Sequence, residues 1–579
     1  MKKLYRILTV VCVLSLLAGV TAFASGDASE ASSSGEASAE GTRIRVFETT
    51  DLHGYLMDTS SGSEDTFQYR LAYIAQLVSD ARASDEFDDV LLLDGGDTYQ
   101  GAPVSNLLTG AAVRAAMDAM DYDATVLGNH EFDWGVTAYC ADPDGTVPAY
   151  DIGGFSGDPD IPILASNLYY AGTNDRVDFT KDYVIVEKAG FRIALIGYIP
   201  NYRADIMAEE IAPYSIDASL SVLAERVREI HAEEQPDVTV VMAHASPQAV
   251  AAALDPAEVD LVTGGHSHQG VYGVAENGIP FIQGACQGQG YATATIVVTE
   301  DGNVTVEDPL YTGITFNRGL LYDTPENAAN LDDTVLAISH AAWTDVSDEM
   351  SEVLGYIDTP VDGTKTGDNA ATYAGNWFTG LMLRATEPYG AVAAFYNSGG
   401  IRTFLRIPSG ETTRVLTAGD VYAIAPFSNY LYVYDITGAE LAQQLKDGFR
   451  NGNYGDQMSG LTFTYEIDGA GRNAEITIVS ITLDDGTAVD PTDDETLYRV
   501  CTSNYSATLD GSVFVDKEPV IPAAESPIDN LAMIDLLRAE ARDNDGYIAV
   551  DTGVRGTCLN PEASDEASGE VSGEPSAEP

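Results

Sequence analysis

The chain has 579 residues, of which 45% are hydrophobic and 9% are aromatic, a composition that excludes a wholly disordered protein. One hydrophobic core rarely extends beyond roughly 250–300 residues, so we expect at least two domains. The formal net charge of −61 argues against a nucleic-acid partner, because such a field repels polyanions.

Residues 1–24 have the pattern of a secretory signal peptide. Lys2, Lys3 and Arg6 precede an apolar run over residues 7–20, and Ala22-Phe23-Ala24 forms a small-residue cleavage site. The alternative is a membrane anchor, but the run is shorter than the ~20 residues that a spanning helix needs. We therefore expect a secreted, extracytoplasmic protein without stable membrane insertion once the signal peptide is removed.

The remaining chain divides by composition and pattern. Residues 25–41 and 560–579 are rich in Ser, Ala and Glu, and both segments are expected to be disordered. Between them we expect a first domain over 42–311, a linker with a helix over 312–352 and a second domain over 353–559.

Short apolar strands alternate with helical stretches in the first domain, which predicts a layered α/β fold. The expected strands are 43–48, 90–93, 124–127, 161–164, 192–198, 238–243, 261–263 and 292–298, and the expected helices are 67–82, 111–120 and 220–233. Farther along the chain, helices are expected at 327–343 and 376–385, and strands at 392–396, 430–436 and 498–502.

Five short polar motifs follow the ends of expected strands, at the edge where open α/β sheets bind ligands. They are Asp51-Leu52-His53-Gly54, Asp94-Gly95-Gly96-Asp97, Gly128-Asn129-His130-Glu131-Phe132-Asp133, His244, and Gly264-Gly265-His266-Ser267-His268. They contain five of the seven histidines of the chain. Taken singly, each motif could be an ordinary turn or a surface histidine.

Together, these motifs provide imidazole and carboxylate groups suited to Zn, Mn, Fe or Co. Two Asp, one Asn and four His are too many ligands for one metal and about right for two. A bridging carboxylate would hold two metals ~3.5–4 Å apart, with a shared bridging hydroxide as the nucleophile.

The order of the motifs resembles that of the calcineurin-like metallophosphoesterases, and more closely that of the exported 5′-nucleotidase and 2′,3′-cyclic phosphodiesterase family. Asn397-Ser398-Gly399-Gly400-Ile401-Arg402 resembles the NxGGIR motif of that family, and Phe427 and Tyr505 resemble its two aromatic positions. The resemblance covers roughly residues 42–559. It implies an α/β protein with a four-layer α/β/β/α metallophosphoesterase domain, followed by a smaller α+β domain that binds the substrate.

The resemblance also implies a role for each of these residues. Asp51, His53, Asp97 and His268 would bind one metal, and Asp97 would bridge to a second metal bound by Asn129, His244 and His266. His130 would be the catalytic histidine, oriented by Asp133, although Asp133 could instead cap a helix. Asn397 and Arg402 would contact the substrate phosphate, and Phe427 and Tyr505 would stack on the nucleobase.

The second domain departs from the family in two places. Asp368 occupies the position of a phosphate-binding arginine, with Lys365 as the nearby alternative cation. The glycine-rich stretch after the second aromatic is altered, and Tyr505 could instead be a core aromatic at a strand end.

The sequence does not pair Cys140, Cys286, Cys501 and Cys558, which could form disulfides or remain buried thiols.

The leading hypothesis is a two-metal phosphohydrolase of the 5′-nucleotidase type, with a small-molecule nucleotide as its substrate. The alternatives are a 2′,3′-cyclic-nucleotide phosphodiesterase or 3′-nucleotidase, a hydrolase of nucleotide sugars or another small ester, and a non-catalytic surface binding protein.

Overall fold

The computed structural model describes residues 41–59, 64–135, 161–202, 206, 208–367, 371–450, 453–469, 474–509, 511–515, 517–522 and 525–560. The expected signal peptide lies outside these ranges, as do Cys140, Asp368 and nearly all of both expected tails. Gly41, expected in the first tail, instead begins a strand. Within the described ranges, no helix combines the length and the apolar character needed to cross a membrane.

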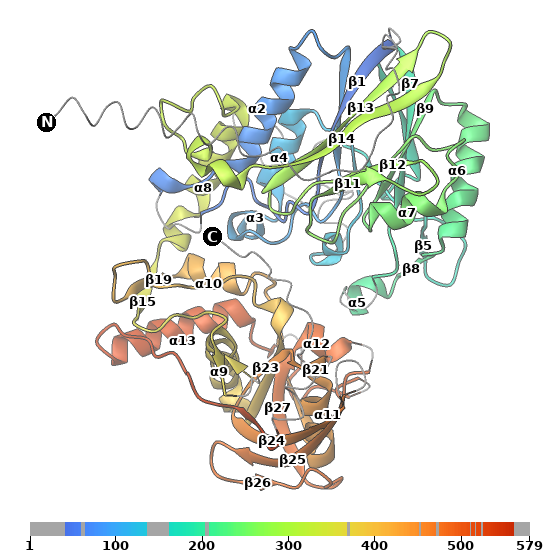
Figure 1. The fold of residues 1–579 in the computed structure, drawn as a ribbon. Helices are drawn as coiled ribbons and strands as arrows, with labels where there is room; N and C mark the ends of the chain where they lie inside the picture. The colour runs from blue at the N-terminus through green and yellow to red at the C-terminus, as the bar shows by residue number, and fades with distance from the viewer. Residues whose placement is uncertain are drawn as a thin grey trace, which may run out of the picture. The chain divides into compact units, whose positions relative to one another are not determined.

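Two six-stranded sheets form the first half of the protein (Figure 1). The first sheet has the order β14-β13-β1-β2-β3-β4. Its strands are β1 (Gly41–Thr49), β2 (Asp89–Asp94), β3 (Ala124–Val126), β4 (Ile163–Leu164), β13 (Gly290–Thr299) and β14 (Val304–Gly313). The four strands β1 to β4 run parallel, so their carboxyl ends meet at one edge.

The second sheet has the order β11-β12-β10-β9-β7-β6. Its strands are β6 (Tyr183–Lys188), β7 (Phe191–Tyr198), β9 (Val238–Ala243), β10 (Leu261–Thr263), β11 (Val271–Val274) and β12 (Pro280–Gln283). Strands β7, β9, β10 and β12 are parallel, which again gathers their carboxyl ends at one edge. A separate pair joins β5 (Leu168–Tyr170) to β8 (Tyr214–Ile216).

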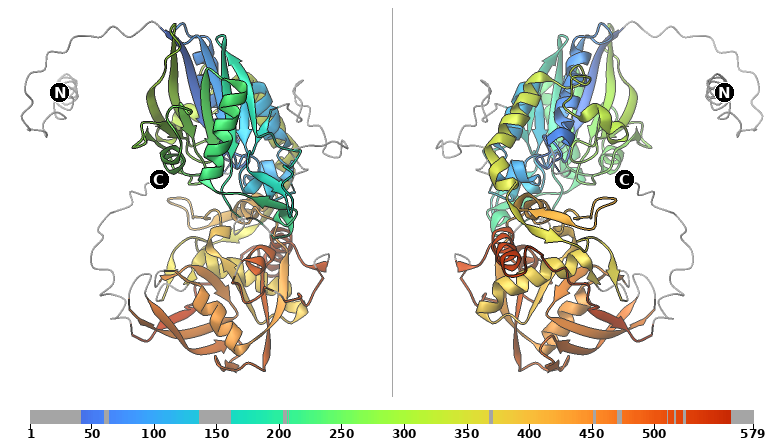
Figure 2. Two further views of the ribbon diagram at one scale, coloured as in Figure 1. Left: turned by 90° about the vertical axis from the view of Figure 1, so that its right-hand side faces the viewer. Right: turned by 90° about the vertical axis from the view of Figure 1, so that its left-hand side faces the viewer.

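The two sheets pack face to face and are covered by helices on their outer faces (Figure 2). Alternate residues of both sheets, including Val46, Leu93, Leu195 and Val240, form the buried core between them. The helices α2 (Arg70–Arg82) and α4 (Ala111–Met120) pack on the first sheet, and α6 (Leu220–Glu234) and α7 (Pro247–Ala253) pack on the second. The expected α/β/β/α layers are confirmed.

Short helices occupy several connections of this region. They are η1 (Glu64–Thr66), α3 (Pro103–Leu107), η2 (His130–Phe132), α5 (Ala208–Ile211) and η4 (Thr315–Leu321). The helix expected at 327–343 is α8 (Asp333–Met350), which both begins and ends later. It begins there because the Asp332 carboxylate accepts hydrogen bonds from the amides of Thr334 and Val335.

The C-terminal half contains two four-stranded sheets, β20-β27-β18-β23 and β26-β25-β24-β28, and several two-stranded pairs. The strands are β15 (Val353–Ile357), β16 (Lys365–Thr366), β17 (Ala371–Thr372), β18 (Ala393–Asn397), β19 (Arg414–Thr417), β20 (Leu431–Thr437), β21 (Phe449–Arg450), β22 (Asn453–Tyr454), β23 (Asp456–Ser459), β24 (Leu461–Asp468), β25 (Glu475–Leu483), β26 (Ala488–Val489), β27 (Leu497–Ser503) and β28 (Gly556–Cys558). The helices are α9 (Tyr373–Thr386), η5 (Glu387–Tyr389), η6 (Ser398–Gly400), α10 (Ala418–Ile424), α11 (Gly438–Asp447), α12 (Asn504–Thr508) and α13 (Asp529–Asp543). The mixture of sheets and helices matches the expected α+β fold.

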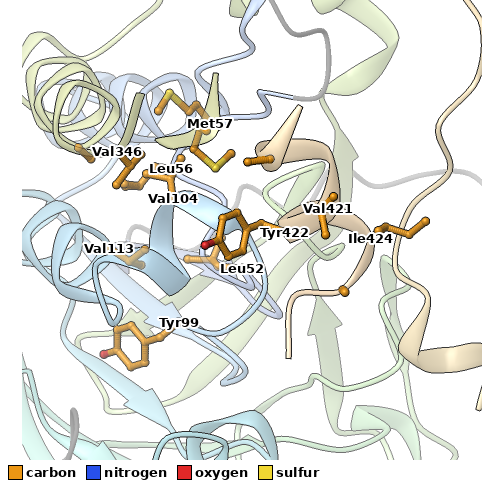
Figure 3. Packing of buried hydrophobic residues seen from close by; sticks show 14 of the residues in the cluster. Leu52, Leu56, Met57, Tyr99, Val104, Val113, Val346, Val421, Tyr422 and Ile424 are labelled. Atoms are coloured by element: carbon orange, nitrogen blue, oxygen red, sulfur yellow. The ribbon is translucent and has the colours of Figure 1, made fainter. Parts of the chain in front are cut away.

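One hydrophobic cluster links the two halves (Figure 3). It contains Val104 of α3, Val113 of α4 and Val346 of α8, together with Val421 and Ile424 of α10. This packing fixes the segment after α10 close to the loops that follow β1 and β2. That segment carries Phe427, one of the predicted substrate-binding residues.

Candidate active site

The seven predicted metal-ligating residues follow β1, β2, β3, β9 and β10 at the carboxyl edges of the two sheets. Six of them, together with His130, form groups whose potential ligand atoms lie within 4.8 Å of one another. One group is Asp51, His53 and His268, another is Asp97, His244 and His266, and a third is His53, Asp97 and His130. Asn129 joins the second group, because its Oδ1 lies 3.0 Å from His266 Nδ1. Asp97 thus belongs to two of the three groups, the one with His244 and His266 and the one with His53 and His130.

The backbone is strained where these ligands lie. Asp51, His53, Asp97, His266 and His268 have φ angles of 50°, 46°, 53°, 69° and 61°. Residues other than glycine rarely adopt this left-handed region, and such conformations cluster at functional sites. The strain is consistent with side chains turned toward a common centre.

One glycine of the motifs is required by close packing. A Cβ atom on Gly128 would lie 2.2 Å from Asp97 Oδ1, closer than any real contact. The glycine therefore lets the loop after β3 approach the carboxylate that both groups share.

The hydrogen bonds of two histidines leave their Nε2 atoms pointed into the site. His53 Nδ1 donates to the Gln100 carbonyl at 2.9 Å, and His244 Nδ1 donates to the Gly95 carbonyl at 2.7 Å. His53 Nε2 then faces His268 Nε2 at 3.0 Å. Backbone carbonyls commonly fix the tautomer of metal-binding histidines in this way.

The electrostatics of the site also fit bound cations. Asp51 and Asp97 are 0% and 1% exposed, and within the described chain they form ion pairs with histidines only. His244 Nε2 lies 3.1 Å from Asp97 Oδ2 but has no hydrogen-bond partner there. Buried carboxylates are costly unless they are paired or bind a metal. The ligand set therefore fits two divalent metal ions of the Zn, Mn, Fe or Co type.

The protonation of the histidines follows from burial and neighbouring charge. Burial lowers the pKa of His53 well below its usual value, and burial with the Arg402 charge lowers the pKa of His268 to about 4. Both rings are therefore neutral near pH 7, the state that binds metals. Burial also acts on His244, but the Asp97 carboxylate outweighs it and raises the pKa of that histidine to about 10. The field around His244 thus favours positive charge.

Glu131 supports the loop of Asp97 from behind. Its carboxylate accepts hydrogen bonds from the amides of Asp97 at 2.9 Å, Thr98 at 2.7 Å and Gly128 at 2.7 Å. Burial and the neighbouring Asp97 charge raise the pKa of Glu131 to about 7. The sequence motif contained this residue, but nothing in the pattern indicated that one side chain would join two strand ends.

His130 and Asp133 lie together as the motif suggested. His130 Nδ1 is 2.8 Å from Asp133 Oδ2, across the short helix η2. Although burial alone would lower it, the charges of Asp133 and Asp97 raise the pKa of His130 to about 9. The Asp133 carboxylate accepts a hydrogen bond from the imidazole, and its backbone N–H donates to the His130 carbonyl at the end of η2.

The four predicted substrate-binding residues line one cavity with the histidine site. The cavity has a volume of about 440 Å³ and is lined by Asp97, Asn129, His130, Asp133, His266, Ser267, His268, Tyr396, Asn397, Gly399, Gly400, Arg402, Phe427, Asn429 and Tyr505. This volume falls in the range of small-molecule sites. Tyr505 belongs to α12 and lines this cavity.

Phe427 contacts His130 and Arg402, which also line the cavity. Its ring stacks on His130 with centroids 5.7 Å apart, and the Arg402 guanidinium lies 5.5 Å from its centre. The preceding carbonyl of Pro426 accepts a hydrogen bond of 2.6 Å from Asn106 Nδ2. The loop that carries Phe427 is thus held by a residue of α3.

Arg402 is the only lysine or arginine among the described residues that line the cavity. Lys365 is exposed and does not line it, so the suggested replacement cation is absent from the described wall. Among the described cysteines, Cys286 and Cys501 are free thiols.

Tyr202, Tyr396 and Asn429 are site residues that the sequence did not indicate. Tyr396 and Asn429 line the cavity and are joined by a hydrogen bond of 3.0 Å from Asn429 Nδ2 to the Tyr396 hydroxyl. The only sequence signal for Asn429 is its position two residues after Phe427. Tyr202 follows β7 and belongs to no motif, so the sequence offers no signal for it.

Comparisons with known proteins agree with this geometry. Residues 44–270 match the calcineurin-like phosphoesterase family, and residues 353–516 match the 5′-nucleotidase C-terminal domain. The chain is 26% identical over 505 residues to the trifunctional nucleotide phosphoesterase protein YfkN of Bacillus subtilis, covering 82% of this chain and 32% of that protein. The chain therefore spans about a third of the length of that relative.

Two further proteins are similar over most of both chains. Protein UshA of Escherichia coli is 25% identical over 532 residues, covering 82% of this chain and 88% of UshA. The crystal structure of a 5′-nucleotidase precursor from Thermus thermophilus has a TM-score of 0.65 at 22% identity, covering 90% of this chain and 99% of that one. The chain belongs to the proteins in which a calcineurin-like phosphoesterase domain precedes a 5′-nucleotidase C-terminal domain.

Proposed function

We propose that the protein is a phosphohydrolase that cleaves nucleotide phosphate esters with two divalent metal ions. The observation that supports this most strongly is the pair of ligand groups around Asp97, which opens into the cavity lined by Arg402, Phe427 and Tyr505. The name of the relative YfkN, a nucleotide phosphoesterase, supports the same substrate class. The native metals could be Zn, Mn, Co or Fe.

The proposed metal site uses the chain's own residues as follows. Asp51, His53 and His268 would hold one ion, and Asn129, His244 and His266 the other, with Asp97 between them. Bound there, the two ions would activate water for attack on phosphorus and neutralise charge on the phosphoryl oxygens.

His130 would act from the cavity side of this site. With Nδ1 bonded to Asp133 at 2.8 Å, its Nε2–H is the hydrogen that remains available to the substrate. It would stabilise charge on the transferring phosphoryl group or protonate the leaving oxygen. A protein that only bound nucleotides would not need this oriented imidazole.

The C-terminal residues would hold the substrate. Asn397 and Arg402 would contact the phosphate, since a guanidinium fork matches phosphate geometry. Phe427 and Tyr505 would stack on the base, a contact worth about 1–3 kcal/mol per base. The division into domains 42–311 and 353–559, with a linker over 312–352, and secretion by an N-terminal signal peptide are parts of the same proposal.

A 2′,3′-cyclic nucleotide is the second candidate substrate. Arg402 is the single described cation of the cavity wall, and a cyclic diester carries less negative charge than a monoester. A panel of nucleoside 5′-monophosphates, 3′-monophosphates, 2′,3′-cyclic nucleotides and nucleotide sugars, each with Mn²⁺, Zn²⁺ or Co²⁺, separates these candidates. Hydrolysis of none of them with any metal would contradict the proposal.

A further inference from the structure

Tyr202 follows β7 and contacts both histidines of the group that contains Asp97. Its ring lies nearly parallel to the His266 imidazole, with centroids 4.0 Å apart and an interplanar angle of 20°. Its hydroxyl donates a hydrogen bond of 3.1 Å to the His244 carbonyl, and its ring stands edge-on to the His244 ring at 5.9 Å. A single side chain thus touches the two imidazole ligands of one candidate metal site.

These contacts restrict how both histidines can move. A ring stacked at 4.0 Å opposes rotation of the His266 imidazole out of its plane, and His266 already has a strained φ of 69°. The bond to the His244 carbonyl holds the backbone of the residue whose Nε2 lies 3.1 Å from Asp97 Oδ2 in the site. Partners of this kind orient metal ligands, and their loss typically costs about 10–100-fold in metal affinity.

Among the described residues, the other candidate metal site has no equivalent aromatic partner. The ring contacts of His53 and His268 there are with histidines: His53 with His130 at 5.1 Å and with His268 at 4.9 Å. Tyr202 therefore acts on one side of the site only. An effect confined to one of two metals distinguishes positioning from a general loss of packing.

We propose that Tyr202 is a positioning residue for Asp97, His244 and His266 and raises the affinity of that group for its divalent ion. The inference rests on the proposed function, in which the chain binds two ions. It assigns to Tyr202 a part in metal binding that is separate from contact with the substrate.

The test is a Co²⁺ titration of the metal-free full chain, followed by visible absorption and checked by metal analysis. The variants are Tyr202→Leu, which removes the ring and the hydroxyl, and Tyr202→Phe, which removes the hydroxyl alone. Tyr547→Leu is the matched control, because Tyr547 is 50% exposed and lies far along the chain from every ligand. Circular dichroism establishes that each variant is folded.

We expect Tyr202→Leu to weaken one of the two binding events by about 10-fold or more and to leave the other within about 2-fold. Tyr202→Phe should weaken the same event by about 5-fold, the value of one ordinary hydrogen bond. Each variant is compared with the wild-type chain by itself. If Tyr202→Leu does not fold, the affinity of Tyr202→Phe alone tests the inference.

Two results overturn the inference while leaving the proposed function intact: wild-type affinity in both Tyr202 variants, or equal weakening of both events. If the wild-type chain itself binds no Co²⁺, the proposed function fails. If it binds two equivalents, the proposed function stands and the Tyr202 variants test the inference alone.

Discussion

Replacing Glu131 with glutamine tests how the loops after β2 and β3 are held together. The Glu131 carboxylate accepts three amide hydrogen bonds, from Asp97, Thr98 and Gly128, at 2.7–2.9 Å. A glutamine whose oxygen takes the place of Oε2 keeps the bonds from Asp97 and Gly128. Its NH₂ group then faces the Thr98 N–H, which is left without an acceptor.

The cost follows from these contacts. At pH 8, where Glu131 is ionised, a buried amide without a partner costs about 1–3 kcal/mol, and the two retained bonds weaken by about 1 kcal/mol each when the acceptor loses its charge. Removing the desolvation cost of the buried carboxylate and its repulsion from Asp97 offsets part of this loss. We expect Glu131→Gln to lower the free energy of unfolding by about 2–3 kcal/mol.

Urea denaturation of the metal-free protein measures this change in the transition that unfolds the first half of the chain. Glu276→Gln is the control, because Glu276 is an exposed acid in the turn between β11 and β12, and surface changes usually stay within about 0.5 kcal/mol. If Glu131→Gln is as stable as the control, the three amide bonds do not support the site in the way we describe.

Three further predictions concern other parts of the protein. His130→Ala should lower kcat by about 10²–10⁴-fold while both metal equivalents are retained; loss of a metal on analysis would instead make His130 a ligand. Phe427→Leu should raise KM for a nucleotide by about 5- to 160-fold, matching about 1–3 kcal/mol of stacking, with little change for a phosphate ester that lacks a base; equal effects on both substrates would refute stacking. Burial raises the pKa of Asp529 to about 7, so the folded protein holds a proton that the unfolded chain releases near pH 4. The stability that this carboxyl contributes is present below pH 4 and is lost as the pH rises through about 7, by about 1.4 kcal/mol per unit between pH 5 and 7. Asp529→Asn should remove that part of the slope in urea denaturation, and an unchanged slope would contradict it.

The positions of the candidate metal ligands could be predicted from the sequence because these residues directly follow the strands. Once β1, β2, β3, β9 and β10 are recognised as short apolar runs, parallel pairing brings Asp51, Asp97 and Asn129 to the carboxyl edge of one sheet, and His244 and His266 to that of the other. Their positive φ angles, by contrast, depend on packing between loops. The presence of an Asp or a His in the sequence does not indicate such a backbone conformation.

Other features depend on contacts between distant segments and could not be predicted. The hydrogen bond from Asn106 to Pro426 joins residues 320 positions apart, and it helps to set where Phe427 lies. The start of α8 was misjudged because the apolar pattern continues before Asp332, whereas the side-chain cap decides where the helix begins. Tyr202 has no motif, since only the fold brings β7 beside β9.

Metal-dependent hydrolysis of a nucleotide tests the central claim most directly. The purified chain is stripped of metal, assayed with nucleoside 5′-monophosphates and 2′,3′-cyclic nucleotides, and assayed again after Mn²⁺, Zn²⁺ or Co²⁺ is added back, with bound metal counted. We predict no phosphate-ester hydrolysis without metal, and activity that returns as two equivalents bind and is lost again on chelation. Hydrolysis that persists after complete removal of metal, or a chain that binds no divalent ion, would contradict the account.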